Sequence, residues 1–159
     1  MRISTDSAIG RWLAESLAAP HEAWQDWQVD RFTMLPTGRR FDAVRMPGEL
    51  VHAAIGDSGH VVVAGVLSAA LSGPVVRDPR WYYALVPPRT TETWTCGLTR
   101  CLGRGAWLVV PRTDQTHHTG LHWCVPMTHP GRLCDPTTVA ALISLGHQRI
   151  QNTRQGTTP

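Results

Sequence analysis

Four short apolar runs between residues 74 and 126 constrain the fold most strongly, because each is bounded by proline or glycine. The runs are PVVRD (74–78), RWYYALVPP (80–88), AWLVVP (106–111) and HWCVP (122–126). Short runs rich in valine and aromatic residues and closed by turn formers are typical of β-strands. We predict that they form a mainly antiparallel sheet.

The first thirty residues carry a helical pattern. Residues 7–19 place four apolar side chains at helical spacing, with Ser7 as the expected N-cap and Pro20 as the stop. In the next stretch, Trp24 and Trp27 are three residues apart and would share one face of a helix. Packing against the core is their expected use.

The middle of the chain mixes strand and helix signals. The run FTML, the turn PTGRR and the run FDAVRMP predict a hairpin or two short strands between Phe32 and Pro47. Pro47 is then expected at the first helical position of a helix that ends at Gly56. In DSGHVVVAGVLSAALSG the valines favour a strand, but the length and spacing favour a helix closed by Gly73. A strand followed directly by a helix indicates an α/β arrangement.

Near the C-terminus, DPTTVAALISLG predicts a helix with Asp135 as N-cap, Pro136 at the first helical position and Gly146 past the last turn. The polar residues that follow have no pattern that could bury a face, so we expect them to fray. With 159 residues, 42% hydrophobic and 17% charged, the chain fits one globular α+β domain. We predict a helical segment (1–29) packing on an α/β core (30–146), followed by a flexible tail (147–159).

Charge and composition narrow the possible partners. The net charge of +3 is too small to indicate nucleic-acid binding by itself, and all 15 basic residues are arginine, as expected of a GC-rich, actinobacterial genome. The N-terminus lacks the order of a secretory signal, and no apolar run approaches the ~20 residues that span a bilayer. We therefore expect a cytoplasmic protein with no membrane partner. Its cysteines are then expected to be thiols or metal ligands: Cys96, Cys101, Cys124 and Cys134.

The loop between the last two apolar runs raises the question of a bound ion. Four residues that could ligate zinc lie close in sequence: His117, His118, His122 and Cys124. On a strand, His122 and Cys124 would share one face that the loop histidines need not join, and no Cys-x-x-Cys pair is present. The turn around Arg104 could hold an anion instead, although it has neither Walker spacing nor a dinucleotide fingerprint. We favour a packed sheet with an exposed histidine loop and no cofactor, with zinc or magnesium as the alternative.

The order strand, turn, strand, helix, then strands ending in GRGAWLVVPRTDQTHHTGLHWCVP resembles the N-terminal domain of bifunctional DNA primase–polymerases. These belong to the archaeo-eukaryotic primase superfamily, and short actinobacterial relatives of that domain are more similar still. The resemblance covers residues 30–145, and its best match runs from Gly103 to Pro111 and then from His122 to Pro126. It implies a primase–polymerase-like fold.

In that family an acidic pair and a third aspartate hold divalent metal, and a histidine contacts phosphate. Aligned on the prolines, Val44 and Met46 stand at the acidic pair, Trp81 at the histidine and Arg100 near the third aspartate. None of these side chains supplies the oxygen ligands that magnesium needs. A shifted register recovers one carboxylate, Asp42. The resemblance therefore implies a polymerase-like fold with a degenerate active site and without polymerase activity.

These observations predict a non-catalytic domain that binds nucleic acid, a nucleotide or a replication or regulatory partner. The expected phosphate contacts are Arg39, Arg40, Arg45, Arg100, Arg104 and Arg112, and the expected stacking residues are Trp81, Tyr82 and Trp107. Single-stranded DNA or a nucleotide is the expected ligand. One alternative is a metal-dependent enzyme, either a nucleotidyl transferase using Asp42 or a zinc hydrolase using the histidine loop. The other is a protein-interaction module with a tryptophan-rich apolar face.

Overall fold

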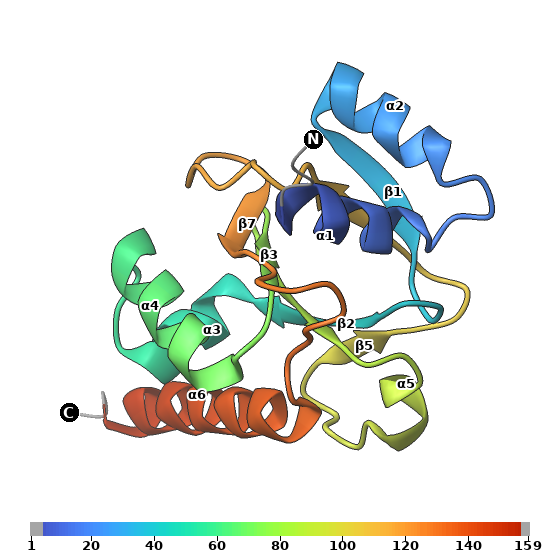
Figure 1. Cartoon of the computed structure of the whole chain (residues 1–159). Coiled ribbons are helices and arrows are strands. Elements are labelled where there is room, and N and C mark those ends of the chain that lie inside the picture. The colour runs from blue at the N-terminus through green and yellow to red at the C-terminus, as the bar shows by residue number, and fades with distance from the viewer. Residues whose placement is uncertain (1–4, 157–159) are drawn as a thin grey trace.

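The computed structural model describes residues 5–156, which form six helices and seven strands (Figure 1). The helices are α1 (Thr5–Ala14), α2 (His21–Asp30), α3 (Gly48–Ile55), α4 (His60–Leu71), α5 (Thr90–Thr93) and α6 (Pro136–Gly156). The strands are β1 (Phe32–Pro36), β2 (Asp42–Pro47), β3 (Val75–Arg77), β4 (Trp81–Val86), β5 (Arg100–Leu102), β6 (Trp107–Pro111) and β7 (His122–Val125). The predicted α+β fold in one domain is confirmed.

The strands form two antiparallel sheets. Five of them stand side by side in the order β5-β2-β4-β3-β7, and β1 pairs with β6 in a separate two-stranded ribbon. The four apolar runs singled out in the sequence are β3, β4, β6 and β7, so their assignment as strands is confirmed. The pattern did not predict β5 or α5, which are only three and four residues long.

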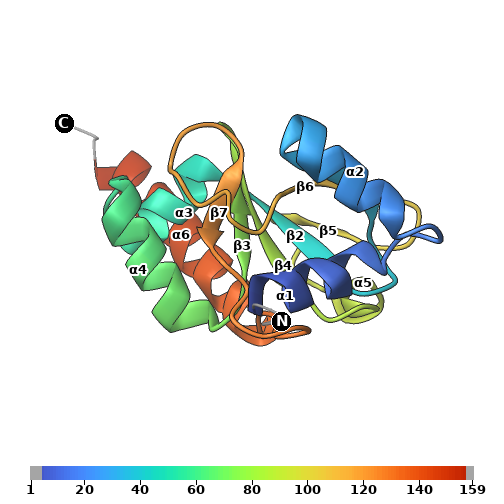
Figure 2. The ribbon, with the colours of Figure 1, turned by 45° about the horizontal axis from the view of Figure 1, so that its top comes forward.

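Helices cover one face of the five-stranded sheet, and a mixed layer covers the other. In Figures 1 and 2, α3, α4 and α6 gather on one side, while α1, α2 and the ribbon lie on the opposite side. Each layer encloses its own core. The helical side buries Val44, Met46 and Ile143 among others, and the opposite side buries Phe41 and Trp123. The two faces therefore offer separate places for a functional site.

Trp24 and Trp27 share one face of α2, as their spacing predicted, with ring centres 5.3 Å apart. Trp27 is buried in the core, where its indole Nε1–H donates to the carbonyl of Val110 at 3.1 Å. Trp24 remains exposed at the surface. The expected packing role is therefore confirmed for Trp27.

The predicted hairpin between Phe32 and Pro47 is wrong, whereas the alternative of two short strands is correct. β1 pairs with β6 and β2 pairs with β4 and β5, so the two strands belong to different sheets. The intervening turn docks on the β5–β6 loop: the Thr37 N–H donates to the carbonyl of Ala106 at 3.0 Å. Because each strand finds its partners later in the chain, the local hairpin does not form.

Helix boundaries differ from the predictions by a few residues. α1 begins upstream of Ser7 and ends at Ala14, and Pro20 stands at the N-cap of α2. α3 follows Pro47, which remains in β2, and closes at Gly56 with a φ of 84°. α4 is a helix, as its length predicted, and it closes at Ser72 one residue before the expected glycine.

The predicted end of the last helix at Gly146 is wrong, and so is the frayed tail for residues 147–156. α6 continues to Gly156. Gly146 lies inside it where a Cβ would be only 2.3 Å from the carbonyl oxygen of Leu50, so glycine permits the close crossing with α3. Beyond it, Ile150 packs against the core and Arg149 donates to the carbonyl of Ala54 at 2.6 Å. Residues 157–159 lie outside the described part of the chain.

The outer side of α4 is apolar, because Val61, Val62 and Val66 are all exposed. Over residues 5–156 no helix is both long enough and apolar enough to cross a membrane by itself. Taken together, α3 and α4 are long and apolar enough for a membrane span, but the two helix axes are bent by 79° relative to each other.

Candidate functional site

Arg45, Trp81 and Arg100 lie on one face of the five-stranded sheet, and we call them the arginine–tryptophan surface. Arg45 of β2 is directly opposite both Tyr83 of β4 and Arg100 of β5. Residues paired across strands point to the same face, and Trp81 shares it because it is two residues from Tyr83. The guanidinium carbon of Arg45 lies 4.4 Å from the centre of the Trp81 ring, a cation–π contact. The structure thus brings together three residues predicted to contact nucleic acid.

The arginine–tryptophan surface carries positive charge, and one carboxylate, that of Asp78, lies beside it. Over the described part of the chain, neither Arg45 nor Arg100 forms an ion pair. Asp78, which follows β3, accepts hydrogen bonds from the backbone N–H of Trp81 at 2.7 Å and from the Tyr83 hydroxyl. Burial and this carboxylate raise the pKa of Tyr83 to about 12, so the phenol stays neutral. Two like charges directly opposite each other destabilise a sheet, so this arrangement favours an anion between them.

The four positions aligned with a polymerase metal site do not form one site. Val44 and Met46 are buried against α3, α4 and α6, on the helical face of the sheet. Trp81 and Arg100 belong to the opposite face, because side chains alternate along a strand. The expectation that these four residues occupy a former metal site is therefore wrong.

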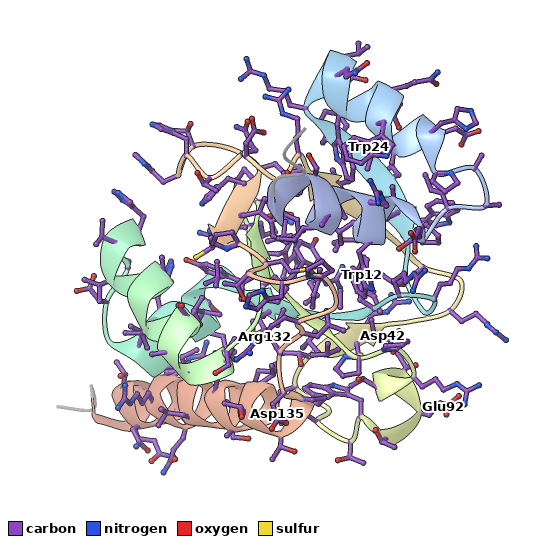
Figure 3. The ribbon with its side chains drawn as sticks, viewed as in Figure 1. Trp12, Trp24, Asp42, Glu92, Arg132 and Asp135 are labelled. Carbon is purple, nitrogen blue, oxygen red and sulfur yellow. The ribbon has the colours of Figure 1, made fainter. Side chains whose placement is uncertain are left out.

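Asp42, the alternative catalytic carboxylate, is fully buried at the start of β2. Its Oδ2 accepts the backbone N–H of Thr91 at 3.0 Å, while its Oδ1 has no hydrogen-bond partner among the described residues. The side chain lines a cavity of about 120 Å³ together with Glu92, Arg89 and Arg104. Figure 3 places Asp42 and Glu92 at the α5 end of the sheet. Glu92 was not predicted as a site residue, because α5, the helix that carries it, was not predicted.

Arg104 and Arg112 lie away from the arginine–tryptophan surface. Arg104 is in the β5–β6 loop, and its backbone packs so closely on Gly38 that a Cβ there would meet its nitrogen at 2.6 Å. Arg112 follows β6 and binds Asp114 through Nε–Oδ1 at 2.6 Å and Nη2–Oδ2 at 3.1 Å. Its hydrogen bond and charge lower the pKa of Asp114. The guanidinium of Arg112 is therefore already paired with a carboxylate. The predicted phosphate contacts lie in separate regions and do not form one site.

Trp107, predicted to stack on a base, lies on the outer face of the β1–β6 ribbon. In the strand register Met34 is opposite Val109 and Pro36 is opposite Trp107, so these residues share a face with Phe32. Phe32 and Met34 are each 44% exposed and Trp107 is 53% exposed. The neighbours of Trp107 across the ribbon are thus apolar, without the arginines that a phosphate would need.

Two of the histidines, His118 and His122, line one cavity together with Cys124. His122 and Cys124 share the helical face of β7, as predicted, and the Nδ1 of His122 lies 2.9 Å from the carbonyl oxygen of Gly120. The rings of His117 and His118 stack with their centres 4.6 Å apart. Within residues 5–156, no group of three histidine, cysteine, aspartate or glutamate side chains is placed to hold a metal ion.

All four cysteines are free thiols, so none forms a disulfide. Burial raises the pKa of Cys124 to about 11, and burial together with Asp42 raises the pKa of Cys101 to about 12. Burial also raises the pKa of Cys134 to about 12. A nucleophilic cysteine needs its thiolate, so these three are poor candidates for covalent catalysis.

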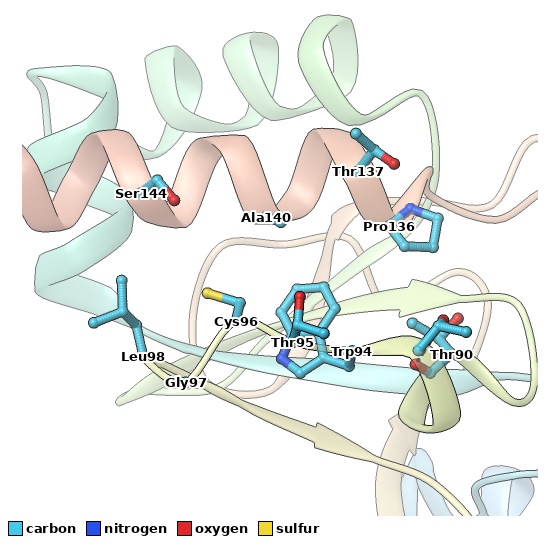
Figure 4. A pocket seen from close by; sticks show the side chains of 11 residues that line it. Thr90, Trp94, Thr95, Cys96, Gly97, Leu98, Pro136, Thr137, Ala140 and Ser144 are labelled. Carbon is cyan, nitrogen blue, oxygen red and sulfur yellow. Dashed lines mark hydrogen bonds between the residues drawn. The ribbon is translucent and has the colours of Figure 1, made fainter.

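A cavity of about 670 Å³ lies between α6 and the loop that follows α5 (Figure 4). Its described lining residues include several hydroxyl groups and the thiol of Cys96, and none of them is charged. The Trp94 indole forms part of the wall and donates to the carbonyl of Thr99 at 3.3 Å. Sequence reasoning missed this cavity, because it joins segments that are about forty residues apart along the chain. It can offer hydrogen bonds but no charge to a ligand.

Comparison of the chain with protein-family models, curated proteins and solved structures finds no significant match. The resemblance to primase–polymerase domains stays a prediction. The function has to be inferred from the geometry of the sites.

Proposed function

We propose that the chain is a non-catalytic domain that binds single-stranded nucleic acid at the arginine–tryptophan surface. The observation that carries this proposal is the direct opposition of Arg45 and Arg100 on neighbouring strands, without a carboxylate partner among the described residues. An anion bound between the two guanidinium groups would remove their repulsion. Arginine binds phosphate through paired N–H donors, and a nucleic-acid backbone supplies phosphates at regular spacing.

Trp81 favours nucleic acid over a free phosphate. Its ring is only partly buried and adjoins Arg45, which places an aromatic surface beside a phosphate contact. Stacking of an unpaired base on an aromatic side chain contributes about 1–3 kcal/mol, whichever base it is. A single strand presents such bases, whereas a duplex hides them. Two phosphate contacts and one stacking residue correspond to weak binding, in keeping with the net charge of +3.

Fluorescence anisotropy of a labelled oligothymidylate tests the proposal. We expect weak, reversible binding at low salt that the double variant Arg45→Gln/Arg100→Gln reduces at least tenfold. The matched control is Arg11→Gln/Arg132→Gln, which removes the same charge from two exposed positions elsewhere. Equal losses in both double variants would show diffuse charge attraction, and absence of binding at low salt would refute the proposal.

We propose a non-catalytic domain because the described side chains that could bind a divalent metal ion are poorly suited to do so. Asp42, the carboxylate that a metal site could use, shares its small cavity with Arg89 and Arg104 as well as with Glu92. Arginine beside a carboxylate competes with a divalent cation for the same charge. A metal-dependent enzyme is therefore the less supported alternative, and we expect no primer synthesis with magnesium or manganese.

A protein-interaction role is a second candidate, and the outer face of the β1–β6 ribbon favours it. Phe32, Met34 and Trp107 form an exposed apolar stripe across two strands. Exposed apolar patches on a folded protein commonly mark interaction sites. Light scattering of the purified chain tests self-association at this stripe. A concentration-dependent dimer that Met34→Ser/Trp107→Ser converts to monomer would support it, and a wild-type monomer at all concentrations would exclude self-association.

A further inference from the structure

A third cavity lies on the helical face of the sheet, at the ends of β3, β4 and β7. Its volume is about 400 Å³, within the range of small-molecule sites. Figure 2 shows α4 beside β7, and the cavity lies between them. The residues that line it are Ser58, His60, Val61, Ala64, Arg77, Tyr82, Thr116, His118, His122, Trp123 and Cys124. No carboxylate occurs among these described lining residues.

Arg77 supplies a permanent positive charge to this cavity. Its guanidinium carbon lies 4.0 Å from the centre of the Tyr82 ring, and its Nη1 is buried without a hydrogen-bond partner among the described residues. Gly48 makes room for the group, because a Cβ there would lie 3.0 Å from Nη1. Within residues 5–156, Arg77 forms no ion pair. The guanidinium charge thus has no counter-ion among the described residues, and because Arg77 lines the cavity, an anion bound there would compensate it.

The histidines of the cavity add donors that can become charged. The rings of His60 and His118 stack with centres 3.9 Å apart, which joins the start of α4 to the β6–β7 loop. Removal from water and the neighbouring His60 and His117 lower the pKa of His118. Burial and Arg77, together with nearby histidines, likewise lower the pKa of His122, while its bond to Gly120 opposes the shift. The surroundings thus resist imidazolium formation in the absence of an anion.

We propose that this cavity binds a small organic oxyanion, one that carries a phosphate monoester or a carboxylate group. The anionic group would pair with Arg77 and with the N–H groups of the histidines. The carbon part would pack on the apolar wall formed by Val61 and Ala64 of α4. This site is distinct from the proposed nucleic-acid surface, because Arg77 and His122 lie on the opposite face of the sheet from Arg45.

The affinity for such an anion should increase as the pH falls. A bound anion stabilises the imidazolium form, so it raises the pKa values of His118 and His122. The binding energy contributed by protonation is then fully present below the pKa of the free protein and is lost as the pH rises through the pKa of the complex. The titratable and charged groups around the cavity are Arg77, His52, Asp57, His60, Tyr82, His117, His118, His122 and Cys124. Asp57 is the one carboxylate among these groups. Its negative charge acts to raise the pKa of His52, which does not line the cavity.

Histidine ring resonances in NMR spectra report binding directly. The probes are inorganic phosphate, phenyl phosphate and benzoate, added to the wild-type chain at mildly acidic and mildly alkaline pH. We expect saturable shifts of the His118 and His122 resonances, with phenyl phosphate at least tenfold tighter than inorganic phosphate at acidic pH. Phenyl phosphate and benzoate then identify which oxyanion the site prefers. Linear, unsaturated shifts with all three probes would overturn the proposal.

Two variants separate specific binding from general charge attraction. Arg77→Gln should weaken phenyl phosphate at least tenfold, whereas Arg80→Gln, an exposed arginine near the same strand end, should have little effect. Because Arg77 also packs on Tyr82, a second variant uses exposed positions only: His60→Ala/His118→Ala should weaken binding and flatten its pH dependence. His21→Ala/His129→Ala is its control. Unchanged binding in both cavity variants would refute the site.

Anion binding in the cavity can be tested separately from nucleic-acid binding at the arginine–tryptophan surface. Arg45→Gln/Arg100→Gln should leave the phenyl phosphate titration unchanged, and Arg77→Gln should leave oligothymidylate binding unchanged. If both variants abolished both activities, the two surfaces would not be separate sites, and the cavity proposal would fail.

Discussion

Two glycines in helices should respond in opposite ways to the same substitution. Gly146 lies inside α6 where it crosses α3, and Gly65 lies on the exposed side of α4. Replacing each glycine by alanine adds one methyl group and changes the helix propensity by the same amount. The difference between the two variants therefore isolates the effect of the crossing.

The structure sets the expected magnitudes. At Gly146, the new Cβ would lie 2.3 Å from the Leu50 carbonyl oxygen and 3.1 Å from its Cγ, so the backbone of α3 would have to move. Because the short contact is with backbone, we take the upper part of the range for overpacking, about 2–3 kcal/mol, of which alanine recovers about 1 kcal/mol through its higher helix propensity. We expect Gly146→Ala to lower the free energy of unfolding by about 1–2 kcal/mol. At Gly65 nothing lies within 4 Å, so Gly65→Ala should raise it by about 0.5–1 kcal/mol.

Equilibrium unfolding in urea, followed by tryptophan fluorescence, measures both changes. The sign at Gly146 is the decisive result. If Gly146→Ala stabilised the chain as much as Gly65→Ala, the crossing with α3 would not exist, and the original prediction of a helix that ends at Gly146 would regain support.

Three further predictions concern the core, the thiols and catalysis. Trp27→Phe removes the donor to the buried Val110 carbonyl and should cost about 2–3 kcal/mol in the same urea assay; a loss well under that range would argue against the hydrogen bond. Cys101 and Cys124, with pKa values raised to about 12 and about 11, should react with iodoacetamide at neutral pH far more slowly than free cysteine, and rapid labelling in mass spectra would contradict their burial. Primer-extension assays with magnesium or manganese should give no product, and incorporation that Asp42→Asn abolishes would show that the chain is a metal-dependent enzyme after all.

The sequence predicts strands well where the signal is local. β3, β4, β6 and β7 are short apolar runs between turn formers, and each forms where expected. The pairing of β1 could not be predicted in this way, because its partner β6 follows about seventy residues later. The end of α6 was predicted wrongly for a related reason. From sequence alone, a glycine that permits a close helix crossing cannot be distinguished from a glycine that ends a helix.

The candidate sites were predicted only in part. Arg45, Trp81 and Arg100 were named from sequence, but their meeting depends on the register of three strands, which no local pattern shows. Arg77 and His60 were missed, since their importance comes from a shared cavity that has no carboxylate among its described lining residues. A motif search depends on spacing along the chain, whereas these five residues come from five different elements.

The salt dependence of oligothymidylate binding tests the central claim most directly. Each phosphate neutralised on a single strand contributes about 0.7 to the slope of log affinity against log salt concentration. If Arg45 and Arg100 each hold a phosphate, the wild-type slope should exceed that of Arg45→Gln/Arg100→Gln by about 1.4. The slope of Arg11→Gln/Arg132→Gln should equal the wild-type slope. A double variant at Arg45 and Arg100 that keeps the full wild-type slope would contradict the account, because the phosphates would then be bound elsewhere.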